Sequence, residues 1–103
     1  MSAQIYIMVK IVKTELKLRE VERKFKTSCR QVSILDRQMD SLQVRYKRAY
    51  ESKRPSLYNS FRMRLATLEG VRQAFYLYAM EKATEKHLLK EEMRQELMRT
   101  TEE

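Results

Sequence analysis

Apolar side chains recur with a heptad period in the first half of the sequence. This pattern predicts a long helix that packs along one face. Between residues 7 and 49, eleven of the thirteen a and d positions are apolar, and the stripe runs for more than five heptads. A coiled-coil seam explains this length, and a core-facing helix of a monomeric bundle is the alternative. The a positions hold Ile11, Leu18, Phe25, Val32, Met39 and Tyr46, and the d positions hold Ile7, Thr14, Val21, Ser28, Leu35, Leu42 and Ala49.

The scarcity of helix-breaking residues extends this prediction to the whole chain. The 103 residues include one Gly and one Pro, too few for the turns of a sheet protein. Pro55 lies in the only cluster of breakers and suits the first turn of a helix, while Ser52, Ser56, Asn59 and Ser60 are candidate N-caps. We therefore predict one all-α domain, a long antiparallel helical hairpin or coiled coil, with helices at about 4–53 and 57–100 and a turn at about 52–60. Residues 4–12 are rich in β-branched side chains, so a short strand there is an alternative.

Charges beside the first stripe have opposite signs on its two edges. Lysines recur at the g positions, from Lys10 to Lys24, whereas the e positions include Glu15, Glu22 and Asp36. Parallel self-pairing would bring Lys10 beside Glu15 of a second copy, whereas antiparallel self-pairing would oppose lysines. The edges therefore favour a parallel pair of first helices.

The second helix has more apolar surface than one seam requires. Fifteen of the 24 residues from 57 to 80 are apolar, and Gly70 is best explained where another backbone comes close. Two helices alone cannot cover this surface, so we predict a homodimer with a four-helix arrangement, or a helical partner protein on the same face. The predicted partner-binding seam comprises Ile7, Ile11, Leu18, Val21, Phe25, Val32, Leu35, Met39, Leu42, Phe61, Leu65, Leu68, Val71, Phe75 and Tyr78.

Positive charge gathers around the predicted turn. The chain carries a net charge of +8, and its basic residues alternate with tyrosines between residues 45 and 64. Such a cluster suits nucleic acid or an anionic lipid surface, and a solvated tip whose arginines pack on tyrosines is the alternative. Ser56, after Lys-Arg-Pro, is a possible phosphorylation site. The possible polyanion-binding residues are Arg45, Lys47, Arg48, Lys53, Arg54, Arg62 and Arg64.

The sequence contains no motif of a catalytic or cofactor site. One His and one Cys leave no zinc spacing, and His87 with Glu91 is at most half of a metal site. We expect neither enzymatic activity nor a cofactor. The longest apolar stretch, residues 5–12, is too short to cross a bilayer, and unpaired Cys29 indicates a reducing compartment, cytoplasmic or nuclear. The predicted function is that of a coiled-coil interaction or scaffold protein that self-associates and recruits a helical partner. The alternative is a basic helical protein that binds a polyanion through its turn.

Overall fold

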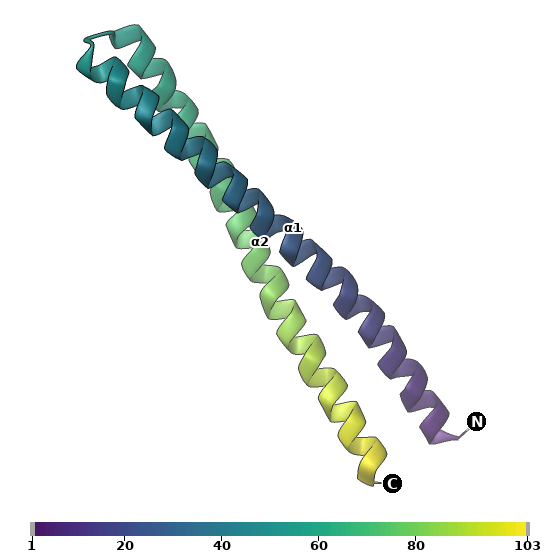
Figure 1. The fold of residues 1–103 in the computed structure, drawn as a ribbon. Coiled ribbons are helices and arrows are strands. Elements are labelled where there is room, and N and C mark those ends of the chain that lie inside the picture. The colour runs from purple at the N-terminus through teal and green to yellow at the C-terminus, as the bar shows by residue number, and fades with distance from the viewer. Residues whose placement is uncertain (1, 103) are drawn as a thin grey trace. The chain divides into compact units, whose positions relative to one another are not determined.

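Two long helices account for nearly all of the computed structural model, which describes residues 2–102. Helix α1 spans Ala3–Glu51 and helix α2 spans Pro55–Glu102, and no strand occurs among the described residues. Figure 1 shows α1 passing into a short turn from which α2 runs back. The predicted all-α helical hairpin is confirmed, and residues 4–12 belong to a helix.

The hairpin divides into two compact units along its length. The terminal unit pairs the start of α1, up to Lys26, with α2 from Ala79 onward, and the turn unit is Thr27–Tyr78. Ion pairs between residues 10 and 96 and between residues 22 and 86 show that the helices of the terminal unit are antiparallel. The turn itself makes the helices of the other unit antiparallel.

The turn is shorter than the predicted 52–60 because α1 ends in a Schellman motif. Lys53 has a φ of 55°, and its N–H donates to the carbonyl of Tyr50 at 3.1 Å. The N–H of Arg54 donates to the carbonyl of Ala49 at 3.1 Å, which completes the motif. Pro55 then begins α2, as predicted. The carbonyl of Arg54 accepts the first helical hydrogen bonds, so Arg54 is the N-cap residue. The candidate caps Ser52, Ser56, Asn59 and Ser60 do not have that role.

The predicted heptad stripe of α1 is covered over its full length. All seven d positions are buried and all six a positions are half-buried. The two polar d positions are also buried, and the hydroxyl of Thr14 donates to the carbonyl of Lys10 at 2.9 Å. No large side chain among the described residues is fully buried, so this core is thin.

The seam of α2 differs from the predicted stripe. Val71 and Tyr78 are exposed, at 41% and 38%, and the seam instead contains Arg72 and Ala79. Alternating steps of three and four residues from Leu68 lead to these positions, whereas an apolar pattern alone points to their neighbours. The buried and half-buried seam of α2 comprises Tyr58, Phe61, Leu65, Leu68, Arg72, Phe75, Ala79, Lys82, Lys86, Leu89, Met93 and Glu96.

The edge charges of α1 find their partners within the chain. Lys10 pairs with Glu96 at 2.9 Å and Glu22 pairs with Lys86 at 3.5 Å. Asp36 accepts a hydrogen bond from Arg72. In this structure α2 therefore covers the seam of α1 and pairs with its edge charges. The sequence favoured a second, parallel copy of α1 for both.

Candidate interaction surfaces

The predicted partner-binding residues lie mainly inside the hairpin. All nine on α1 are buried or half-buried, and so are Phe61, Leu65, Leu68 and Phe75 on α2. Only Val71 and Tyr78 of the set are exposed. The other thirteen are covered, wholly or in part, within the hairpin.

An apolar row lies on α1 outside its seam, and we call it the N-terminal apolar face. Ile5, Met8, Val9, Val12 and Leu16 are all exposed and occupy b, e and f positions of the heptad. Four of them, together with Lys13, line a groove of about 510 Å³. The heptad assignment contained the signal for this face: later b and f positions are mostly charged, whereas those before residue 17 are apolar.

A second row, the α2 outer face, lies on the side of the helix opposite its seam. It consists of Met63, Ala66, Gly70, Ala74 and Leu77, and all five are exposed. Met63 is 70% exposed and Leu77 is 56% exposed. A Cβ placed on Gly70 would meet no atom within 4 Å, so the close backbone predicted for this glycine does not come from the same chain. A second chain there stays a prediction.

The tyrosines of the turn unit pack on one another. The ring centroid of Tyr58 lies 6.1 Å from that of Tyr46 and 5.5 Å from that of Tyr50. Tyr46 and Tyr50 are themselves stacked at 6.4 Å. These rings therefore form a small aromatic cluster that joins the two helices beside the turn.

The basic residues of the turn unit are exposed and fall into two groups. Arg45, Arg48 and Arg54 line a groove of about 240 Å³, and Arg45 continues with Arg64 along a second groove of about 500 Å³. The other three, Lys47, Lys53 and Arg62, line neither groove, and neither groove includes a tyrosine. None of the seven forms an ion pair in the part of the chain that the structure describes.

Among the described side chains of the terminal unit, one carboxylate is buried. Glu96 is 4% exposed, and it accepts hydrogen bonds from Lys10 at 2.9 Å and from Arg99 at 3.3 Å. The hydrogen bond from Lys10 lowers the pKa of the Glu96 carboxyl below its ordinary value and raises the pKa of Lys10. This pair holds opposite charges together inside the seam.

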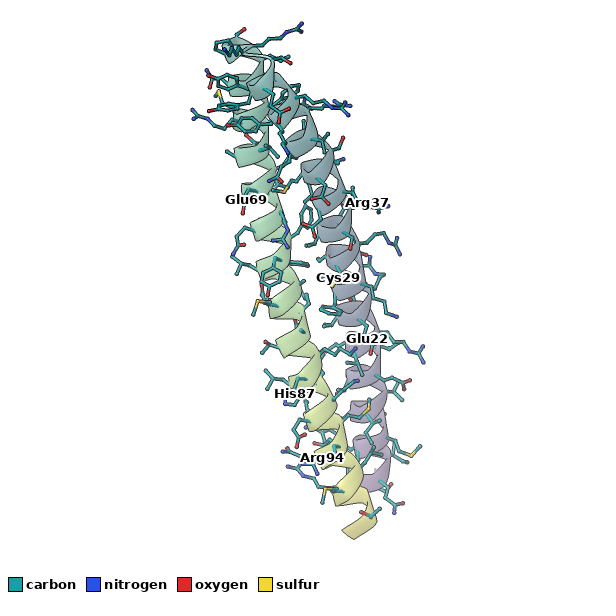
Figure 2. The ribbon with its side chains drawn as sticks, turned by 60° about the vertical axis from the view of Figure 1, so that its left-hand side comes forward. Glu22, Cys29, Arg37, Glu69, His87 and Arg94 are labelled. Carbon is teal, nitrogen blue, oxygen red and sulfur yellow. The ribbon has the colours of Figure 1, made fainter. Side chains whose placement is uncertain are left out.

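The cysteine and the histidine of the chain lie on different helices. Cys29 and His87, both labelled in Figure 2, are exposed on α1 and α2 respectively. Glu91 forms its ion pair with Arg94, whose hydrogen bond lowers the pKa of the Glu91 carboxyl. Within residues 2–102, no group of three or more His, Cys, Asp or Glu side chains is placed to hold a metal ion. Ser56 is exposed in the first turn of α2.

Comparison of the chain with models of protein families, with curated proteins and with solved structures gave no match. Neither helix, over the residues described, has a stretch long and apolar enough to span a membrane.

Proposed function

We propose that this protein is a non-enzymatic coiled-coil interaction module that pairs with a second copy of itself and recruits a helical partner protein. The observation that supports the proposal is the α2 outer face, where Met63, Leu77 and three small residues are exposed. Burial of apolar surface is the main driving force for association between proteins. An apolar row of this kind gains most when another helix covers it.

The arrangement of this face favours a second copy as its occupant. Met63 lies seven residues before Gly70 and Leu77 lies seven after it, while Ala66 and Ala74 flank it by four residues on either side. A two-fold axis through Gly70 would therefore place Ala66 opposite Ala74 of the other chain and Met63 opposite its Leu77. Such a contact is self-complementary, as a two-fold interface requires. Two hairpins joined in this way form a four-helix arrangement.

The N-terminal apolar face supplies the surface for a different chain. Its five exposed side chains extend from Ile5 to Leu16, about 17 Å along the helix. Anchors spaced by three or four residues are typical of helix-in-groove recognition. We therefore assign recruitment of a helical partner protein to this face and self-association to α2.

The mass of the protein in solution tests the proposal. Light scattering coupled to size exclusion should give twice the 12.5 kDa chain mass at micromolar concentration. The double variant Met63→Glu and Leu77→Glu should be monomeric, because it places like charges opposite each other across the two-fold axis.

The matched control replaces Val71 and Tyr76 with Glu. Both are exposed apolar residues of α2, at 41% and 44%, but they lie on its flanks and not on the outer face. This control should keep the dimer mass. A wild-type monomer at about 100 μM would refute self-association, since any pairing would then be weaker than about −5 kcal/mol. Equal dissociation of both double variants would refute the assignment of the face.

A further inference from the structure

The grooves beside the turn have uncompensated positive charge on one edge of the hairpin. Arg45, Arg48 and Arg54 line the smaller groove, and Arg64 extends the row into the larger one. The residues that line the grooves lie between positions 38 and 68, where the sequence holds two acids, Asp40 and Glu51, and neither lines a groove. Arginine suits phosphate because its planar guanidinium can donate two parallel hydrogen bonds.

The grooves also have apolar walls. Exposed Leu57 and half-buried Phe61 lie in the smaller groove, and half-buried Leu68 lies in the larger one. The larger groove adds the polar side chains of Gln38, Ser41 and Thr67. Apolar walls beside arginines can take the face of an unpaired base, while hydroxyl and amide groups can bond its edge or its sugar.

The two grooves share Arg45 and together extend beside α1 from Gln38 to Ser52, about 20 Å along the helix. A stacked strand advances about 3.4 Å per nucleotide, so this length spans about six phosphates. A row of four arginines therefore fits an extended polyanion better than a compact one.

We propose that these grooves bind single-stranded nucleic acid, with Arg45, Arg48, Arg54 and Arg64 contacting its phosphates and the apolar walls contacting its bases. We expect the contact to be largely independent of base sequence, because phosphate contacts and stacking are available to every nucleotide. The tyrosines do not contribute, since they pack on one another outside both grooves.

The test is fluorescence anisotropy with a labelled oligothymidine of about 12 nucleotides, within the range of known single-strand sites. The wild-type protein should bind, with an affinity that falls as salt rises. Replacement of Arg45, Arg48 and Arg54 by Gln should weaken binding by about tenfold or more. It should also reduce the slope of log affinity against log salt by about 2, because each single-strand phosphate contact contributes about 0.7.

The matched control removes the same charge from the same unit. Lys47, Lys53 and Arg62 are replaced by Gln, and all three are exposed outside the grooves. This variant should retain most of the affinity of the wild-type protein. Equal losses in the two triple variants would refute the proposal, because they would show diffuse attraction to net charge. Circular dichroism should show unchanged helicity in both variants.

Two further probes distinguish the other anions. A duplex of the same length should bind less tightly than the single strand, because its base faces are stacked; equal or tighter duplex binding would refute the contact with bases. Vesicles of phosphatidylcholine with phosphatidylserine provide a phosphate surface without bases. Vesicle binding that depends on Arg45, Arg48 and Arg54, without oligonucleotide binding, would refute the proposal in favour of a lipid surface.

Discussion

Replacement of Gly70 by Ala should stabilise the hairpin. Glycine in a helix interior is about 1 kcal/mol less favourable than alanine, because it loses more backbone freedom on folding. The added methyl group would meet no atom within 4 Å, and the position is exposed, so no packing cost opposes this gain. We expect the free energy of unfolding to rise by about 1 kcal/mol. For a chain of this size, that corresponds to a midpoint about 4 to 8 °C higher.

Thermal unfolding followed by circular dichroism measures this effect, at concentrations where the wild-type chain is monomeric. Ala66→Gly and Ala74→Gly are the controls, since both residues are exposed one turn away on the same face. Each should lower the midpoint by a similar amount. A lower or unchanged midpoint for Gly70→Ala, with the expected losses in both controls, would refute the reasoning. At higher concentration the same substitution should weaken self-association, because the methyl group separates the two backbones at the proposed axis.

Two further predictions concern the turn and the buried carboxylate. Lys53 has a left-handed conformation, which costs a residue with a Cβ about 1 to 2 kcal/mol. Lys53→Gly should therefore raise the free energy of unfolding by up to about 1 kcal/mol in chemical denaturation, whereas Lys53→Ala, which removes the charge but keeps the Cβ, should not. The pKa of Glu96 is lowered in the folded chain, so its stabilising effect is present above its unfolded pKa and is lost as the pH falls through the folded value. Unfolding midpoints from pH 7 down to pH 2 should fall less steeply for Glu96→Gln than for the wild-type chain, and equal slopes would contradict this.

The register of α1 could be predicted because its seam is almost uninterrupted. The thirteen a and d positions fit a single heptad register, and the two buried polar residues among them, Thr14 and Ser28, did not obscure that register. The seam of α2 contains Arg72, Lys82 and other charged residues. Apolar periodicity therefore predicted seam positions at Val71 and Tyr78, where the structure has Arg72 and Ala79. Arg72, Lys86 and Glu96 pair with groups on α1, whereas Lys82 pairs with Glu85 on α2 itself. Which groups of the two helices oppose one another depends on the length of the turn.

The candidate sites, like the two seams, could be predicted only in part from the sequence. The basic tip was recognisable from composition, but arginines and tyrosines were predicted as one cluster. Tyr50 is at an e position and Arg45 at a g position, and these positions flank opposite sides of a seam. The heptad positions alone therefore predict that the aromatic cluster and the arginine-lined grooves lie on opposite sides of the seam. The apolar walls of the grooves could not be predicted from the heptads of α1, because Leu57 and Phe61 belong to α2.

The charged residues in the seam reinforce the alignment that the turn sets. A purely apolar heptad seam tolerates a slip of seven residues, since every slip places apolar groups opposite one another. Here a slip of one heptad on α2 would place Glu22 opposite Met93 or Ala79 and not opposite Lys86. The slip that brings Ala79 opposite Glu22 would also bring Leu89, in place of Glu96, opposite Lys10. Half-buried and buried charges without partners are costly, so these pairs favour one register over its neighbours, as polar groups do in coiled-coil seams. The ion pairs of Lys10 with Glu96 and of Glu22 with Lys86 therefore add specificity to a seam that is otherwise mainly apolar.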